Sequence, residues 1–280
     1  MNQIARNQPD LTIEPNLAKR ILTGFIRSEL QRVGFHKAVI GLSGGLDSAV
    51  SCFLAAEALG AENVLAIRMP YKSSSQDSLD HAQLGIDQLG VQSLTIPITG
   101  MADALIEQFP GMDSMRRGNI MVRSRMITLY DQSAAFQGLV IGTSNKTEIL
   151  LGYSTIYGDS ACAINPLGDL YKTQVRQLAQ ALDVPAPIRE KAPSADLWSN
   201  QTDEGELGFT YAEVDRLLYL LVDERYSPQD CVEAGFLEQF VDKVVEKVRR
   251  SQYKRVMPPI AKVSNRTIGY DFLYLRDWGT

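Results

Sequence analysis

The residues with the clearest chemical pattern run from Gly41 to Ser48 and read GLSGGLDS. An apolar run precedes them and a helical pattern follows, which predicts a glycine turn between a buried strand and a helix. Free backbone N–H groups and the positive end of the helix dipole make such a turn an anion site, and Ser43 adds a hydroxyl donor. Gly44 and Gly45 let the backbone approach a phosphate closely. The stretch therefore predicts a phosphate-binding loop.

This loop lacks the lysine of the common GxxxxGK[ST] pattern, and Asp47 stands at that position. A carboxylate repels a phosphate unless a cation lies between them, and magnesium bridging Asp47 and the phosphate oxygens would remove the repulsion. The alternative interpretation is structural. In that case Gly44 and Gly45 supply positive φ values, and Asp47 and Ser48 satisfy free N–H groups in the first turn of the helix.

The elements that must position this loop alternate between apolar strands and helices. Strands are predicted at 37–43, 63–70, 93–98 and 139–144, and helices at 16–33, 46–59, 75–89, 118–136 and 145–153. This alternation indicates an α/β fold: a doubly wound, mostly parallel sheet with helices on both faces and right-handed connections.

The pattern changes after residue 153. We expect a loop before a helix at 172–182, a long loop at 184–208, and C-terminal helices at 211–226 and 228–251. A loop of that length in a compact domain is more often functional than accidental. We expect one domain over 1–280, with the core sheet at about 16–185 and a C-terminal loop and helical part at about 186–280.

Composition excludes several classes of protein. The net charge of -5 argues against a general nucleic-acid binder. No apolar run approaches the ~20 residues of a membrane span, and the first ten residues, MNQIARNQPD, lack the apolar core of a secretory signal. Three scattered cysteines, at 52, 162 and 231, and two histidines form no metal-binding spacing. A cytoplasmic protein without nucleic-acid or membrane partners is the simplest interpretation.

The hexapeptide SGGLDS (Ser43–Ser48) resembles the pyrophosphate-binding motif SGGxDS of the ATP pyrophosphatase group. These enzymes activate a carboxylate or carbonyl with AMP and release pyrophosphate. The group includes GMP, asparagine and argininosuccinate synthetases, tRNA thiolation enzymes and NAD+ synthetases. The motif therefore implies the first half-reaction and leaves the substrate open.

Other segments resemble NAD+ synthetases in their order and spacing. They are RGNIMVRSRMITLY (117–130), GTSNKTEILLGY (142–153), YGD (157–159), PLGDLYKTQV (166–175), KAPSADLW (191–198), DEGELG (203–208) and YKR (253–255). The resemblance runs from about residue 16 to residue 259. It implies an adenine nucleotide α-hydrolase-like fold and ATP-dependent amidation of deamido-NAD+ to NAD+. The reaction would pass through an adenylated carboxylate, with ammonia as nitrogen donor and AMP and pyrophosphate released.

The resemblance also implies residue roles. It assigns ATP binding to Gly41, Leu42, Ser43, Gly44, Gly45, Leu46, Asp47, Ser48, Arg68, Gln76, Thr143, Lys172 and Ser194. It assigns deamido-NAD+ binding to Asn119, Arg123, Asp159, Tyr253 and Lys254. Asp47 and Glu148 would hold Mg2+, and Asp47 and Lys172 would be catalytic. Asp159 is the candidate for deprotonating ammonium.

Each of these side chains also has a simpler interpretation. Arg123 and Lys172 would be solvated helix charges, and Glu148 a first-turn carboxylate favoured by the helix dipole. The acidic run TDEGEL (202–207) is expected to be a solvated loop. The longer loop 186–208 is expected to close over the adenylate and keep water out.

Two positions depart from the family pattern. Ile156 stands where many ammonia-using relatives have a lysine, and Ala163 stands where they have an aspartate; both positions touch the dinucleotide in the family. GYSTIYGD (152–159) is nearer to the synthetase half of glutamine-using enzymes, but the chain has no room for their amidase domain. Free ammonia is the favoured donor, and ammonia from a separate glutamine-using partner is the alternative.

Other functions stay open at this point. One is another ATP pyrophosphatase, of the tRNA thiolation or GMP synthetase type, and another is a nucleotide-sensing protein that has kept the fold without catalysis. The resemblance implies a homodimer, and apolar helices near 118–137 and 211–226 are the candidates for its interface.

Overall fold

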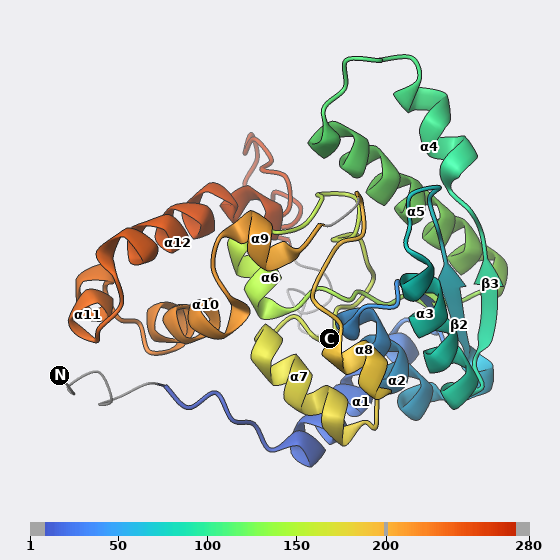
Figure 1. The fold of residues 1–280 in the computed structure, drawn as a ribbon, viewed down its shortest axis with the longest axis horizontal. Helices are drawn as coiled ribbons and strands as arrows, with labels where there is room; N and C mark the ends of the chain where they lie inside the picture. Colours follow the sequence, from blue (N-terminus) through green and yellow to red (C-terminus); the bar gives the residue numbers. More distant parts are fainter. Residues whose placement is uncertain (1–8, 199–200, 273–280) are drawn as a thin grey trace.

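The computed structural model describes residues 9–198 and 201–272 (Figure 1). Within them, a four-stranded sheet has the order β3-β2-β1-β4, and each pair of neighbours is parallel. The strands are β1 (Ala38–Gly41), β2 (Val64–Arg68), β3 (Gln92–Thr95) and β4 (Leu139–Val140). Ala38 pairs with Val64 on one side and with Leu139 on the other. The prediction of a parallel α/β sheet is confirmed.

Helices cover both faces of the sheet, because alternate residues of its central strand point to opposite sides. Ala38 and Ile40 pack into a core with α1 (Pro15–Arg32), α2 (Leu46–Leu59), α3 (Gln76–Leu89) and α7 (Lys172–Ala181). Val39 packs on the other face, where Leu129 of α5 (Ser114–Phe136) covers it. The strand is therefore apolar throughout, as both of its faces are buried.

A second apolar core lies beside the sheet domain, at the left of Figure 1. It is built by α6 (Lys146–Leu151), α10 (Tyr211–Leu218), the single π-turn η2 (Tyr219–Asp223), α11 (Pro228–Glu233) and α12 (Glu238–Arg250). Helix α7 joins the two cores, because its residues Val175 and Leu178 lie in the first and the preceding Tyr171 lies in the second. No helix in 9–198 or 201–272 combines the length and apolarity needed to cross a membrane.

Several predicted boundaries are wrong for identifiable reasons. The helix expected at 228–251 is two helices, because Gly235 takes a φ of 107° between them. Helix α5 begins four residues before the predicted position, since the carboxylate of Asp113 accepts from the N–H of Arg116 and starts it earlier. Three further elements were not predicted: α4 (Thr99–Ile106), η1 (Ala61–Asn63) and η3 (Gln252–Arg255).

The long segment expected as a loop holds two short helices, α8 (Ala186–Glu190) and α9 (Asp203–Leu207); residues 199–200 lie outside the described part of the chain. Its acidic part, expected to be solvated, is helical because the Thr202 hydroxyl accepts from the N–H of Gly205 at 3.3 Å. A threonine followed by acidic residues in the first turn is a helix-start signal that was available in the sequence.

Candidate active site

A cavity of about 270 Å³ opens beyond the carboxyl ends of β1, β2 and β4. Open parallel sheets bind ligands at this edge. Thirteen of the predicted site residues line it: Gly41, Leu42, Ser43, Gly45, Leu46, Asp47, Ser48, Arg68, Thr143, Glu148, Asp159, Lys172 and Ser194.

The loop between β1 and α2 forms one wall of this cavity. Gly44 takes a φ of 77°, and a Cβ there would lie 2.0 Å from the carbonyl oxygen of Ser78. Gly45 is extended, with φ -91°, so the expectation that both glycines adopt positive φ is wrong for the second. The Ser48 hydroxyl accepts from the N–H of Ser43 at 3.2 Å and donates to the carbonyl of Gly45 at 3.0 Å. The loop is therefore held in shape by its own hydroxyls.

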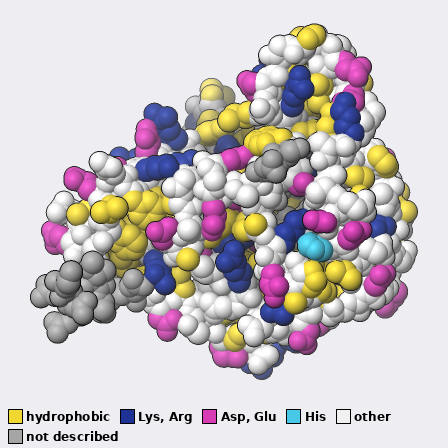
Figure 2. Space-filling view, in the orientation of Figure 1, with side chains coloured by type: hydrophobic (Ala, Val, Ile, Leu, Met, Phe, Trp, Pro, Cys, Tyr) yellow, Lys and Arg dark blue, Asp and Glu magenta, His cyan; other side chains and the backbone are white. Residues whose placement is uncertain are grey.

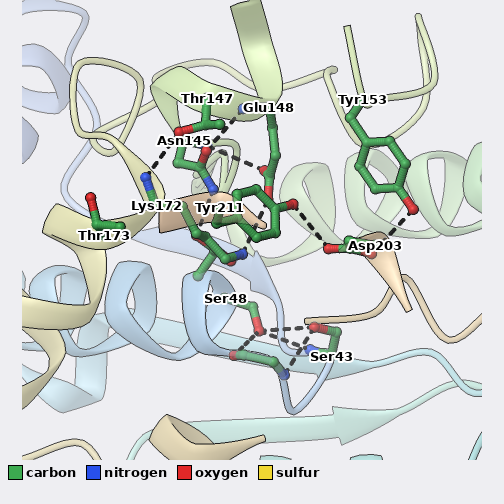
Figure 3. Close-up of polar contacts among 12 residues, drawn as sticks. Ser43, Ser48, Asn145, Thr147, Glu148, Tyr153, Lys172, Thr173, Asp203 and Tyr211 are labelled. Carbon is green, nitrogen blue, oxygen red and sulfur yellow. Dashed lines mark hydrogen bonds and ion pairs between the residues drawn. The ribbon is translucent and has the colours of Figure 1, made fainter. Parts of the chain in front are cut away.

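Asp47 turns its carboxylate away from its own helix. One oxygen accepts from Nδ2 of Asn145 at 2.9 Å, and the other forms an ion pair with Lys172. These partners belong to the start of α6 and the start of α7 (Figure 3). The structural alternative, in which Asp47 satisfies N–H groups of its own helix turn, is therefore wrong.

Lys172 lies between two carboxylates. Its Nζ also contacts Oε1 of Glu148 at 3.2 Å and lies 5.1 Å from the centre of the Tyr211 ring. Only 3% of Lys172 is exposed, so the alternative of a solvated helix charge is wrong. Burial by itself lowers the pKa of this amine, but the charges of Asp47 and Glu148 outweigh burial and raise the pKa above its ordinary value.

Glu148 combines a structural role with a place in the site. It forms a capping box with Asn145, so the helix-start interpretation is correct for one of its oxygens, while the other faces Lys172. Burial raises the pKa of Glu148 to about 8, and the nearby Asp47 charge adds to the rise. In the part of the chain that is described, no group of three or more His, Cys, Asp or Glu side chains could hold a metal.

The predicted dinucleotide residues meet on the segment after α6. Lys254 Nζ donates to the carbonyl oxygens of Gly152 and Ser154, at 2.8 and 2.6 Å. Arg123 donates through Nε and Nη2 to the carbonyl oxygen of Ile156, at 3.3 and 3.2 Å, so it is not a free surface charge.

The same segment holds two more of the predicted residues. The N–H of Thr155 donates to Oδ1 of Asp159 at 2.6 Å, and the Thr155 hydroxyl donates to Oδ1 of Asn119 at 2.8 Å. Three of the five predicted dinucleotide residues, Asn119, Arg123 and Lys254, therefore contact the segment 152–160. A fourth, Asp159, belongs to this segment and lines the cavity.

Two other predicted residues lie apart from this arrangement. Tyr253 is 58% exposed. Gln76 donates to the carboxylate of Asp80 in its own helix at 2.8 Å, and neither side chain lines the cavity.

Sequence reasoning missed several charged residues of the cavity. Asp203 is 5% exposed and accepts hydrogen bonds from the hydroxyls of Tyr153 and Tyr211, each at 3.1 Å (Figure 3). Burial raises the pKa of this carboxyl. Arg125 donates through Nε to the carbonyl oxygen of Met69 at 3.1 Å and lines the cavity.

A further pair of contacts fixes the segment after α8 against α3. Lys191 donates to the hydroxyl of Ser78 at 2.7 Å, and Asp196 accepts from the same hydroxyl at 3.0 Å. Both residues line the cavity.

The chain is similar to known proteins along almost its whole length. A family model described as NAD synthase matches residues 18–258. The NH(3)-dependent NAD(+) synthetase of Trichlorobacter lovleyi is 58% identical over 96% of this chain and 98% of its own. The structure of an NH3-dependent NAD synthetase from Campylobacter jejuni aligns with a TM-score of 0.78 at 32% identity, covering 90% of this chain and all of its own. The structure of an NMN synthetase from Francisella tularensis aligns with a TM-score of 0.79 at 32% identity, covering 89% of this chain and 99% of its own. The chain belongs to the NAD synthase family.

Proposed function

We infer that this protein amidates deamido-NAD+ to NAD+, with ATP as the activating substrate and ammonia as the nitrogen donor. The observation that carries the proposal is the contact of Asp47 with both Lys172 and Asn145 at the mouth of a phosphate loop. That arrangement gives the unusual aspartate a role in charge compensation beside a phosphate. Membership of the family supplies the substrate class.

The reaction has two steps. The nicotinate carboxylate attacks the α-phosphorus of ATP, forming an adenylated carboxylate and releasing pyrophosphate. Ammonia then attacks the activated carbonyl, forming the amide and releasing AMP. A carboxylate by itself is a poor acylating agent because oxide would have to leave, and AMP is a far better leaving group.

This chain's own groups act mainly by positioning and by neutralising charge. The N–H groups of the loop would hold phosphate oxygens. The hydroxyls of Ser43 and Ser48 would join them by leaving the partners that they have within the loop. Lys172 compensates the charge of the departing pyrophosphate, and Arg68, Thr143 and Ser194 line the cavity where the nucleoside would lie.

The dinucleotide would bind over residues 152–160, against Asn119, Arg123, Lys254 and the exposed Tyr253. Asp159 would accept a proton from ammonium where this segment meets the cavity. Gln76 could reach the nucleotide only by leaving its partner in α3.

Magnesium fits the donor set. Mg2+ is commonly held by one or two carboxylates together with substrate phosphates, and here Asp47 and Glu148 lie on either side of one ammonium group. We propose that these two carboxylates hold the ion with ATP, which then supplies charge neutralisation to the pyrophosphate.

We also propose that 1–280 work as one catalytic domain in a cytoplasmic homodimer. Helix α5 leaves three large apolar side chains exposed: Met115 (73%), Ile127 (53%) and Tyr130 (42%). Figure 2 shows apolar side chains at the surface near the upper end of this helix. By contrast α10 buries its apolar side within the chain, so α5 is the better interface candidate.

One assay tests the activity and the competing substrates. The protein is incubated with MgATP, ammonium and deamido-NAD+, and NAD+, AMP and pyrophosphate are measured. Equal amounts of the three products are expected. A second arm replaces ammonium with glutamine, which should give no NAD+ unless a partner supplies ammonia. A third replaces the dinucleotide with nicotinate mononucleotide, since one structural relative is an NMN synthetase. Amidation of the mononucleotide alone would overturn the proposed substrate.

A further inference from the structure

The starts of α6 and α7 are tied together by one buried side chain of α10. Asp215 has no exposed surface. Its Oδ1 accepts from the hydroxyl of Thr147 at 2.5 Å, and its Oδ2 accepts from the N–H of Thr173 at 2.8 Å. Thr147 is the neighbour of Glu148, and Thr173 is the neighbour of Lys172. One carboxylate therefore bonds to the neighbours of two site residues.

The Thr147 hydroxyl completes this link. It accepts from the backbone N–H of Lys172 at 3.0 Å while it donates to Asp215. The first N–H groups of a helix have no partner within the helix, and here Thr147 and Asp215 satisfy two of them in α7. The carboxylate also lies at the positive end of the α7 dipole, which favours its charge.

The order of elements shows what this arrangement fixes. Lys172 is the first residue of α7, and Asn145 and Glu148 are the cap and third residue of α6. All three side chains reach the Asp47 region from these first turns. A rotation or slide of α6 against α7 would therefore separate Glu148 from Lys172.

We propose that Thr147 and Asp215 are positioning residues, which set Lys172 and Glu148 at the spacing required for formation of the adenylate. Neither belongs to the residues that line the cavity. Groups that orient metal-ligating side chains by hydrogen bonds commonly change metal affinity or activity by about ten- to a hundredfold when they are removed. The inference rests on the proposed function, so its test needs one readout that is independent of substrates.

Thr147→Val tests the proposal because it removes the hydroxyl and keeps the shape. We expect kcat of deamido-NAD+-dependent ATP–pyrophosphate exchange to fall about tenfold or more, with the KM for ATP nearly unchanged. Thr147→Ser keeps the hydroxyl and should restore the exchange. The matched control is Thr128→Val in α5, which also loses a buried hydroxyl, bonded to the carbonyl oxygen of Ser124 at 3.0 Å. It should lower the urea midpoint and leave kcat unchanged.

A double-mutant cycle separates positioning from loss of stability. If Thr147 acts through Lys172, Thr147→Val should cost less in a Lys172→Arg background than in the native one. Hydrogen–deuterium exchange read at residues 171–175 should become faster in Thr147→Val and stay unchanged in Thr128→Val. If Thr147→Val does not fold, Asp215→Asn provides the same comparisons.

Three results would overturn the inference. The first is unchanged ATP–pyrophosphate exchange in Thr147→Val. The second is an equal loss of kcat from Thr147→Val whether residue 172 is lysine or arginine. The third is unchanged deuterium uptake at residues 171–175. Absence of ATP–pyrophosphate exchange in the unmodified protein would instead count against the proposed function. Deuterium uptake would still decide whether Thr147 holds the start of α7.

Discussion

Lys172 is a buried lysine, which is uncommon in folded proteins. It is 3% exposed, and lysine is almost never buried unless it is paired. Its partners are Asp47 and Glu148, so the charge of this ammonium group is compensated by neighbouring carboxyl groups. Removing one partner of a buried pair leaves the other uncompensated, which costs far more than the pair contributes.

We predict that Asp47→Asn abolishes formation of the adenylate. The amide cannot hold the ion pair with Lys172, and it loses the negative charge proposed to hold the metal. Deamido-NAD+-dependent pyrophosphate exchange should fall at least about a hundredfold. Asp103→Asn is the control, since Asp103 pairs with Lys72 outside the cavity, and it should exchange normally. Exchange that survives in Asp47→Asn would refute the charge-compensation role.

Glu148 should make stability depend on pH. Burial raises its pKa to about 8 from 4.5, so the folded protein keeps a proton that the unfolded chain releases. The contribution of Glu148 is therefore full below pH 4.5 and is lost as the pH rises to about 8.

We predict that Glu148→Gln flattens this dependence. In EDTA, its free energy of unfolding should fall less steeply than that of the native protein between about pH 5 and 8. Glu213 holds the same capping-box position in α10, but hydrogen bonds from Thr210 lower its pKa, so its contribution is lost only on acidification. Glu213→Gln should therefore keep the native slope, as measured by urea denaturation at each pH. Equal slopes in all three proteins would contradict the prediction.

Residues of the site were predictable where a motif carried them. Asp47, Glu148 and Lys172 follow from spacing and resemblance, and the structure brings them together. Asp203 was missed because its partners Tyr153 and Tyr211 lie 50 and 8 residues away, and nothing in the run TDEGEL shows which acid is buried. Which of these acids is buried is decided by the tertiary fold.

At the scale of elements, the phosphate loop and α3 are in contact through Gly44. Its φ of 77° and the 2.0 Å approach that a Cβ would make to the Ser78 carbonyl leave no room for a side chain. The glycine is therefore required by the packing of two elements as well as by the turn itself.

We predict that Gly44→Ala destabilises the protein by about 2–4 kcal/mol, since it adds both a strained φ and a clash. Gly100→Ala is the control. Gly100 lies in α4 with no heavy atom within 4 Å of the added Cβ. The substitution should therefore raise the free energy of unfolding by about 0.5–1 kcal/mol. Urea denaturation of the two variants measures both values. A Gly44→Ala variant as stable as the native protein would show that the loop can move away from α3.

Elements with strong periodicity were predicted well, and those that depend on tertiary contacts were not. The β1–α2 turn and the sheet strands follow from apolar runs bounded by glycine. The start of α9 depends on the Thr202 cap and on the hydrogen bonds of Asp203 and Glu204 with Tyr211. The break between α11 and α12 depends on the positive φ of Gly235. Hydrophobic periodicity detects neither of these features. Short helices within long irregular segments are the elements that sequence periodicity most often failed to predict.

At the scale of the molecule, the exposed apolar residues of α5 are the proposed contact between two copies. Contiguous exposed apolar surface on a folded chain often marks a protein–protein interface. The number of subunits itself could not be read from the sequence, because an apolar helix can equally be covered from within, as α10 is.

We predict that Ile127→Asp shifts the protein from dimer to monomer, because it places a charge where apolar surface would be buried. Light scattering coupled to gel filtration reads the mass. Leu237→Asp changes a side chain that is 77% exposed on a different element and should leave the mass unchanged. A monomeric native protein, or a dimeric Ile127→Asp, would move the interface away from α5.

The position of Thr147 and Asp215 between the two cores has a consequence for folding. Asp215 lies on α10, which packs in the second apolar core, while α7 carries Val175 and Leu178 into the core of the sheet domain. The sheet can therefore form before the active site exists, and large proteins often acquire structure in such stages. On refolding from urea, sheet circular dichroism should return before pyrophosphate exchange does. The recovery of enzyme activity with time would then measure how fast one core docks onto the other.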